Sequence, residues 1–490
     1  MSGLYKRVET GIVGLDQITG GGIPRNHIYL VEGDPGVGKT TLALTYLLEG
    51  VRAGEKGLYI TLSETSDEVR LIAKSHGWSL DGVELFELSA LEAQMRVDAE
   101  NTVFHPSDVE LTETTRAVLA YIDKVKPSRV VFDSLSELRL LAQSHLRYRR
   151  EVLNLKQYFS RNRATVLLLD DRSGNEHDIE LQSIAHGVIS LQQHPPEYGG
   201  DRRRLRIVKM RGIPYQTGFH DFEIVTGGMQ VYPRLIAADH HKVFDAKPVT
   251  SGVAALDSLL AGGIERGTST LLLGPAGAGK SAVSGQYACS LARGGEKVAL
   301  FVFDELRRIA IERADSLGLG MSKLVESGSI IVQQIDPAEM GPGKFSDRIQ
   351  ALVSEGVSMV IIDSLNGYLQ AMPAERFMYI HLHELLAYLG QLGVTTLMTM
   401  AQNGLVGDVR SPVEVTYVAD NVILFRYFEH QGRVRKAISV VKKRTGVHED
   451  TIRELTVGPT VTVGEPLEQF RGVLTSVPTF HGEERELSGR

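Results

Sequence analysis

GDPGVGKT, residues 33–40, is the stretch of sequence that decides the fold of the first half of the chain. It follows an apolar run, HIYLVEG (27–33), and precedes a segment in which apolar residues from Leu42 to Val51 recur at helical spacing. A strand, a glycine-rich turn and a helix, in that order, are the context that a P-loop needs. The glycines let backbone N–H groups turn inward around phosphate oxygens, and the helix points its N-terminus at the same anion. The stretch therefore predicts a phosphate-binding loop.

The same motif returns in the second half of the chain as GPAGAGKS, residues 274–281. Lys39 would reach the β- and γ-phosphates of ATP and the Thr40 hydroxyl would ligate Mg²⁺, with Lys280 and Ser281 in the same roles. Two such motifs at equivalent places argue against a chance glycine-rich turn. The residues expected to contact the nucleotide are Gly33, Asp34, Pro35, Gly36, Val37, Gly38, Lys39, Thr40 and Thr41, and then Gly274, Pro275, Ala276, Gly277, Ala278, Gly279, Lys280 and Ser281.

The chain is a duplication, because other segments recur in the same order as the glycine-rich motifs. TGIVGLD (10–16) returns as SGVAALD (251–257), and Gly11 and Gly252 lie 241 residues apart. A repeat of this length is too long for a solenoid unit, so each copy should have its own core. We predict a first domain at 1–236, a linker at 237–248, a second domain at 249–464 and a mobile tail at 465–490.

Short apolar runs alternate with helix-compatible segments in both copies. Runs of this kind, buried on both faces, are typical of a mainly parallel sheet with helices on either side. The fold class predicted for each copy is therefore α/β. Besides the two runs before the glycine-rich motifs, the expected strands are 58–62, 129–132 and 165–169 in the first copy and 298–303, 358–362 and 395–400 in the second.

Acidic residues follow two of the expected strands in each copy. Asp133 and Asp363 end apolar runs, and in P-loop enzymes an acid at this place holds Mg²⁺. Glu64 and Glu305 each lie 25 residues beyond the lysine of their own motif. Because the carboxyl ends of parallel strands meet at one edge of the sheet, these acids should share a cleft with the nucleotide. We expect the glutamates to orient the attacking water.

Basic pairs lie far downstream of each glycine-rich motif. Lys209 and Arg211 have the same parity in a strand-like run, as do Lys442 and Arg444, so each pair should point to one face. Two interpretations stay open at this point. Each pair could reach the nucleotide of a neighbouring subunit and stabilise the charge of the transition state, or it could belong to an ordinary basic edge strand.

The composition limits the possible partners and surroundings of the protein. Of 490 residues, 53 are Lys or Arg and 60 are Asp or Glu, so the net charge is −7 and a globally basic nucleic-acid binder is not indicated. The single cysteine, Cys289, cannot form an internal disulfide and fits a reducing cytosol. The sequence has no signal-peptide pattern and no run of 18 apolar residues, so we expect a cytoplasmic protein without a membrane span.

Two groups of histidines are candidate metal ligands. His381 and His383 are two residues apart and would face different ways on a helix, which argues against a shared metal with Glu384. For His240 and His241 we likewise expect no metal site.

Several segments beyond these motifs carry a resemblance to a known family. They are TGIVGLD (10–16), SET (63–65), SHGW (75–78), KMRG (209–212), KKR (442–444) and FRGVLTSVP (470–478), together with both P-loops and both Asp-Ser strand ends. On these residues the chain resembles KaiC-family proteins, which are double-domain members of the RecA-like ATPases, over residues 8–478. The fold class implied is two tandem RecA-like P-loop NTPase domains.

The resemblance implies a homohexamer of two stacked rings with ATP bound between subunits in both. It further implies ATP hydrolysis by the first copy, and it allows Ser/Thr autokinase activity in the second and a regulatory protein partner that cannot be named. Lys209, Arg211, Lys442 and Arg444 would then be phosphate contacts made in trans.

The sequence also departs from the family pattern. Family members often have two adjacent glutamates after the second strand, whereas this chain has Ser63-Glu64 and Asp304-Glu305. If the first position of each pair acts, the first copy has lost its base and Asp304 serves in the second. The phosphorylated Ser-Thr pair of the clock proteins falls on Thr416-Tyr417, so only Thr416 keeps an aliphatic hydroxyl.

Two other functions fit the same motifs. A RecA- or RadA-like DNA recombinase would bind DNA through loops at 170–180 and 402–416, but the first has five acids and one arginine, which suits a phosphate backbone poorly. The one basic run, Arg202-Arg203-Arg204, is interpreted as a solvated hairpin edge. A nucleotide sensor that does not hydrolyse ATP is the third possibility, and the incomplete glutamate pair of the first copy would suit it.

Overall fold

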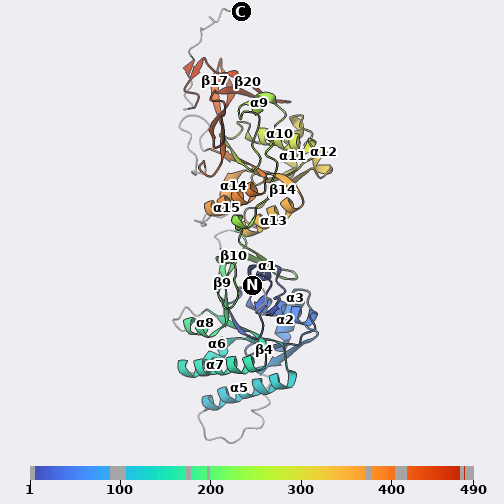
Figure 1. Cartoon of the computed structure of the whole chain (residues 1–490), viewed down its shortest axis with the longest axis vertical. Helices are drawn as coiled ribbons and strands as arrows, with labels where there is room; N and C mark the ends of the chain where they lie inside the picture. Colours follow the sequence, from blue (N-terminus) through green and yellow to red (C-terminus); the bar gives the residue numbers. More distant parts are fainter. Residues whose placement is uncertain are drawn as a thin grey trace, which may run out of the picture. The chain divides into compact units, whose positions relative to one another are not determined.

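The chain folds into two compact units, residues 1–234 and 235–490, each described by itself (Figure 1). The computed structural model describes residues 6–88, 106–142, 144–172, 178–195, 199–370, 378–402, 416–474 and 479–480. The division falls next to the start of the predicted linker, where the short helix η1 (Ala237–Asp239) belongs to the second unit.

The first unit is built on a nine-stranded sheet with the order β11-β10-β9-β8-β3-β7-β6-β4-β5. Strands β8, β3, β7, β6, β4 and β5 run parallel, and β9, β10 and β11 are antiparallel. The strands are β3 Ile28–Gly33, β4 Gly57–Thr61, β5 Val83–Glu87, β6 Arg129–Asp133, β7 Thr165–Asp171, β8 Gly187–His194, β9 Arg202–Met210, β10 His220–Val225 and β11 Gly228–Tyr232, with β1 Arg7–Val8 and β2 Ile23–Pro24 paired separately. The helices are α1 Val13–Ile18, α2 Lys39–Arg52, α3 Ser66–Ser75, α5 Pro106–Val125, α6 Leu135–Ala142, α7 His145–Arg161 and α8 Asp178–Ile184.

The second unit repeats this sheet strand for strand, in the order β20-β19-β18-β17-β12-β16-β15-β13-β14 when read from the same edge. Its strands are β12 Ser269–Gly274, β13 Lys297–Val302, β14 Ile330–Gln334, β15 Val357–Asp363, β16 Thr395–Ala401, β17 Asn421–His430, β18 Arg433–Lys443, β19 Arg453–Val457 and β20 Val461–Pro466, with β21 Phe470–Arg471 and β22 Thr479–Phe480 as a separate pair. Its helices are α9 Ala254–Ser258, α10 Lys280–Arg293, α11 Arg307–Ser316, α12 Met321–Glu326, α13 Pro342–Ser354, α14 Leu365–Gln370 and α15 Met378–Gln391. The predicted fold class is confirmed, and each expected strand lies within two residues of its observed bounds.

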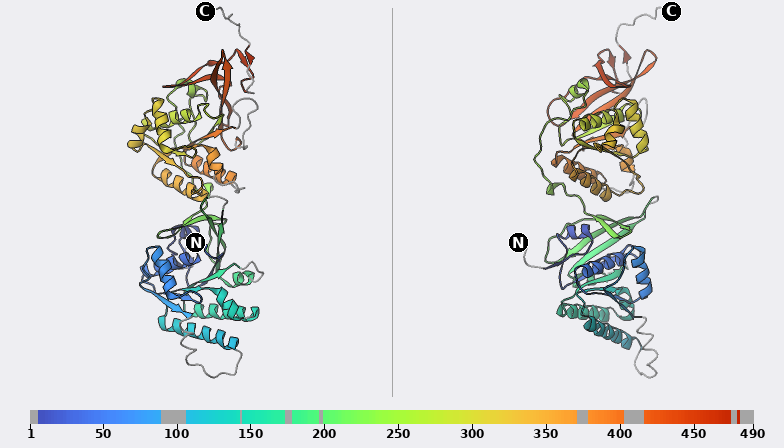
Figure 2. Two further views of the ribbon diagram at one scale, coloured as in Figure 1. Left: turned by 180° about the vertical axis from the view of Figure 1, so that it is seen from behind. Right: turned by 90° about the vertical axis from the view of Figure 1, so that its right-hand side faces the viewer.

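Both faces of the parallel strands are buried, which is why these strands read as continuous apolar runs. In β3, Tyr29 and Val31 pack with helix α2 on one face, while Ile28 and Leu30 pack with α5, α6 and α7 on the other. Figure 2 shows helices on both sides of each sheet. This layering fixes the carboxyl ends of the central strands at one edge, where the glycine-rich motifs lie.

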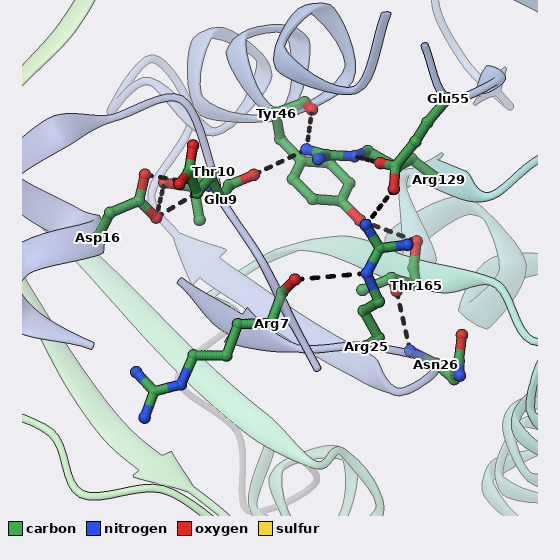
Figure 3. A network of polar contacts seen from close by, with 10 residues as sticks. All are labelled: Arg7, Glu9, Thr10, Asp16, Arg25, Asn26, Tyr46, Glu55, Arg129 and Thr165. Atoms are coloured by element: carbon green, nitrogen blue, oxygen red, sulfur yellow. Dashed lines mark hydrogen bonds and ion pairs between the residues drawn. The ribbon is translucent and has the colours of Figure 1, made fainter. Parts of the chain in front are cut away.

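A buried arginine ties helix α2 of the first unit to its sheet (Figure 3). Arg129, at the start of β6, is 2% exposed and donates to the Glu55 carboxylate at 2.5 Å and to the carbonyl oxygens of Glu9 and Tyr46 at 2.7 and 2.8 Å. Its guanidinium carbon lies 4.8 Å from the centre of the Tyr46 ring. The second unit has the fully buried Met359 at the same register position of its sheet.

The only tryptophan of the chain, Trp78, also belongs to the first unit. It is half-buried against the core around α2 and stacks on His76 with ring centres 4.6 Å apart. A side chain at Gly228, the first residue of β11, would meet its ring at 2.8 Å. Glycine at this position therefore lets β11 lie close to the indole.

Candidate nucleotide-binding sites

The two glycine-rich loops are held in place by close backbone contacts. A Cβ atom at Gly33 would meet the Leu191 carbonyl oxygen at 2.8 Å, and one at Gly274 would meet the Phe425 carbonyl oxygen at 2.5 Å. Helices α2 and α10 begin directly after Gly38 and Gly279, whose φ angles are 112° and 109°, and neither helix has a capping side chain. Their first N–H groups thus need another acceptor, and an anion such as a phosphate suits this place.

The lysines of both motifs curl over their own loops. Lys39 Nζ donates to the carbonyl oxygens of Gly33 and Asp34 at 2.8 and 3.0 Å and forms an ion pair of 2.7 Å with Asp171. Lys280 Nζ donates to the carbonyl oxygens of Gly274 and Pro275 at 2.8 and 2.7 Å. Burial lowers the pKa of Lys280 to about 8. Both ammonium groups are therefore where a β- or γ-phosphate could replace the carbonyl contacts.

Asp171 was not among the predicted site residues. It ends β7 directly beside Gly33, and Ala401 takes its place beside Gly274 in the second unit. Only the strand register brings Asp171 next to Lys39, so no local motif could have identified it.

Asp133 and Glu64 lie together at the carboxyl edge of the first sheet, as predicted. The Tyr59 hydroxyl donates to Asp133, whose pKa is raised mainly by burial. Burial, and then the charge of Asp133, raise the pKa of Glu64. Glu64 Oε2 is buried, and no hydrogen-bond partner for it exists among the described residues. A magnesium ion and a water molecule would meet two carboxylates of the required kind here.

The corresponding acids of the second unit have other partners. The Thr399 hydroxyl donates to Asp363, and the Ser364 hydroxyl donates to Asp304. Glu305 accepts a hydrogen bond from Arg313 Nη1, and Arg313 Nη2 lies 3.7 Å from Asp363 Oδ2. The predicted acids are thus brought together in both units, but with different neighbouring side chains.

Lys209 and Arg211 lie two strands away from β3 and toward its amino end, whereas the glycine-rich loop follows its carboxyl end. Lys209 is paired with Val188, which is paired with Leu30 at the middle of β3, three residues before Gly33. Three residues along the strand and two strand spacings across the sheet separate them by ~14 Å. Neither basic side chain can therefore reach the phosphate site of its own domain.

Carbonyl oxygens at the end of α8 hold this basic pair. Lys209 Nζ donates to the Gln182 carbonyl oxygen and Arg211 Nη2 to that of Ser183 at 3.2 Å. The second unit repeats the arrangement beyond its own central strand, where Val422 is paired with both Leu271 and Lys442.

Lys442 and Arg444 are held by the residues just before β17. Lys442 Nζ donates to the carbonyl oxygens of Thr416 and Ala419 at 2.8 and 2.7 Å. Arg444 donates to the Tyr417 carbonyl oxygen at 3.3 Å and forms an ion pair of 3.0 Å with Asp420. The Thr416 side chain is exposed next to this pair.

One interpretation of the basic residues was wrong. Arg203 and Arg204 do not lie at a hairpin edge, because β9 is paired with β8 on one side and with β10 on the other at these positions. Arg204 and Arg206 lie over the Phe219 ring, with their guanidinium carbons 5.8 and 5.3 Å from its centre. The pattern of charges could not show that two further strands, β10 and β11, continue the sheet beyond β9.

His381 on α15 and Thr41 on α2 contact other side chains of the protein. His381 contacts the Tyr368 hydroxyl at 2.7 Å and the Ser346 hydroxyl at 3.0 Å, whereas His383 is exposed, so the two face different ways as expected. Thr41 lies on α2 with its hydroxyl 3.4 Å from His76 Nε2. Residues 173–177 and 403–415 of the two loops considered for DNA binding lie outside the described residues.

Two general findings concern the described part of the chain as a whole. None of its helices is long and apolar enough to span a membrane. It also contains no group of three or more His, Cys, Asp or Glu side chains arranged to hold a metal ion. Mg²⁺ beside ATP is usually held by one or two protein groups together with the nucleotide phosphates.

Comparison with known proteins gives a consistent result over both units. The family model described as "ATPase: KaiC" matches residues 8–236 and again 249–466. The chain is 25% identical over 488 residues to the circadian clock oscillator protein KaiC of Thermostichus vulcanus, covering 97% of this chain and 92% of the relative. It is 26% identical over 499 residues to the protein of the same name from Rippkaea orientalis, covering 99% and 94%. The circadian clock protein KaiC3 of a Synechocystis species is 25% identical over 502 residues, covering 99% and 97%.

Proposed function

The chain belongs to the KaiC ATPase family, and from this premise we propose that it binds MgATP in both domains and hydrolyses it between the subunits of a double-ring homohexamer. The domains proposed are 1–236 and 249–464, joined by 237–248 and followed by a tail at 465–490. We further propose that the protein is cytoplasmic and acts in signalling or regulation together with a protein partner.

One observation carries the assembly part of the proposal. Lys209 is ~14 Å from Gly33 of its own domain and Arg211 lies further from it along the chain direction of β9, yet both side chains are held by the end of helix α8. A basic pair built in this way can act on a phosphate only if that phosphate belongs to another subunit. A head-to-tail arrangement that closes into a ring supplies every site with such a pair.

Within each site, separate groups bind the phosphates and the magnesium ion. The loop N–H groups and Lys39 or Lys280 bind the β- and γ-phosphates, and Mg²⁺ would be held by Thr40 and Asp133 or by Ser281 and Asp363. When bound, the metal neutralises charge on the transferred phosphoryl group.

The glutamates and the basic pairs act on the reaction itself. Glu64 and Glu305 orient water for attack on the γ-phosphate, with Asp304 as the alternative acid in the second domain. The basic pair of the neighbouring subunit stabilises the charge of the transition state. Positioning and charge stabilisation together are sufficient for phosphoryl transfer.

The test uses γ-labelled ATP with purified protein, following free phosphate and protein-bound label together. Free phosphate alone indicates an ATPase. Label on the protein indicates autokinase activity, with Thr416→Ala as the variant that should remove it. Neither product, with nucleotide bound, indicates a sensor, and stimulation only by added DNA would favour the recombinase alternative.

Lys39→Ala and Lys280→Ala provide the matched binding test. Each should remove one bound nucleotide per chain, because each deletes the cation that faces the phosphates, while Lys74→Ala on the exposed surface of α3 should remove none. Unchanged nucleotide stoichiometry in the chain with both lysines replaced would exclude the proposed sites.

A further inference from the structure

Two positions near the strand-end aspartates Asp133 and Asp363 differ between the domains, and each domain has one polar and one apolar residue there. The first domain has Tyr59 on β4 and Ile72 on α3. The second domain has Leu300 and Arg313 at the same places, 241 residues further along. Of these two positions, the strand residue Tyr59 reaches the strand-end aspartate in the first domain, whereas the helix residue Arg313 does so in the second, where the Thr399 hydroxyl also donates to Asp363.

The consequences for the two glutamates are opposite. Glu64 Oε2 has no hydrogen-bond partner among the described residues. Glu305 Oε2 accepts from Arg313 Nη1, while Arg313 Nη2 lies 3.7 Å from Asp363 Oδ2. Arg313, Asp363 and Ser281 also line one narrow cavity. The guanidinium thus lies between the two acids on which the second site depends.

We propose that Arg313 is a positioning residue that weakens Mg²⁺ binding and slows hydrolysis in the second domain by occupying Glu305 and Asp363. This inference rests on the proposed function of the site. The fixed charge of Arg313 repels a divalent cation near Asp363. The hydrogen bond from Arg313 occupies the Glu305 carboxylate oxygen that would otherwise contact water. In the first domain Ile72 can do neither.

A purely structural role for the ion pair does not explain its position. Arg313 and Glu305 are 37% and 20% exposed, and pairs with this access to solvent contribute little to stability. Arg308 on the same helix forms an ion pair with Glu312 and contacts neither acid of the site, so it provides a matched control.

The experiment exchanges the two residues in the full chain. In a Lys39→Ala background, which leaves only the second site, the Mg²⁺ dependence of binding of a non-hydrolysable ATP analogue is titrated for Arg313→Ile, Arg313→Lys and Arg308→Ile. Arg313→Ile should lower the Mg²⁺ concentration for half-maximal binding by about 10-fold and raise kcat by about 10-fold with little change in KM. Arg313→Lys should stay near the parent chain, and Arg308→Ile should not differ from it.

The reciprocal change tests the same idea from the other side. In a Lys280→Ala background, Ile72→Arg should raise the Mg²⁺ requirement of the first site by about 10-fold and lower its kcat. The inference is overturned if the analogue binds with a Mg²⁺ dependence that Arg313→Ile leaves unchanged, or if that variant hydrolyses ATP more slowly at an unaltered melting temperature. Absence of any nucleotide binding in the parent chain would instead contradict the proposed function.

Discussion

Replacement of Arg211 by alanine should slow ATP hydrolysis in the first domain by ~10³-fold, which corresponds to ~4 kcal/mol of transition-state stabilisation. In the proposed ring this loss occurs at the neighbouring subunit's nucleotide, because the pair Lys209 and Arg211 cannot cross the ~14 Å to its own P-loop. Nucleotide affinity should change little, since Lys39 and the loop N–H groups stay in place.

Subunit mixing makes the prediction quantitative. Chains with Arg211→Ala are mixed in equal amounts with chains carrying Lys39→Ala, all in a Lys280→Ala background so that only the first domain turns over. If subunits exchange at random in a ring, about one quarter of the interfaces combine an intact P-loop with an intact basic pair. Phosphate release should therefore recover from near zero to about one quarter of the parent rate.

The control is a chain with both Arg211→Ala and Lys39→Ala. Mixed with either single variant it should restore nothing, because no interface then has both parts. Exchange is verified by native mass measurements on chains of different tag length. If exchange occurs and the two single variants still fail to complement each other, the trans arrangement is wrong and the pair is an ordinary basic strand end.

The remaining predictions concern single residues. Glu64→Gln and Glu305→Gln should each reduce hydrolysis in their own domain by at least ~100-fold in a phosphate-release assay, with nucleotide affinity nearly unchanged, because only the charge that orients water is lost; a tenfold weaker affinity would point to a binding role. Arg129→Ala should lower the free energy of unfolding by ~3–5 kcal/mol in urea, because the buried guanidinium and its hydrogen bonds to Glu55, Glu9 and Tyr46 are lost; Arg129→Met, the residue type of the second domain, should cost less. Nucleotide affinity of the second site should fall as pH rises above about 8, because free Lys280 then loses its proton and must regain it to bind phosphate; a flat titration of analogue binding between pH 7 and 9.5 would contradict this.

The sequence was sufficient to predict the parts of the site that depend on local pattern. The glycine-rich turns, the strand-end acids Asp133 and Asp363, and the glutamates 25 residues beyond each lysine are separated by fixed local elements. Parallel strands then bring these elements to one edge without further information.

Contacts that depend on strand register or on the facing side of a helix could not be predicted. Asp171 reaches Lys39 only because β7 ends beside β3, and Arg313 reaches Glu305 only because α11 turns that residue toward the sheet. In each case the residue type is unremarkable in its own segment. The position of Arg203 inside the sheet was likewise hidden, because β9 is paired on one side with the preceding strand β8 and on the other with β10, which follows it in the chain.

Trp78 gives the protein an intrinsic optical probe that reports on one half of the chain alone. Being the only tryptophan, it assigns all indole emission to the first domain. Its contact with His76, which in turn lies 3.4 Å from the Thr41 hydroxyl on the P-loop helix, connects that emission to the nucleotide site. Fluorescence and circular dichroism recorded on one sample would therefore separate unfolding of the first domain from unfolding of the whole chain, without any label.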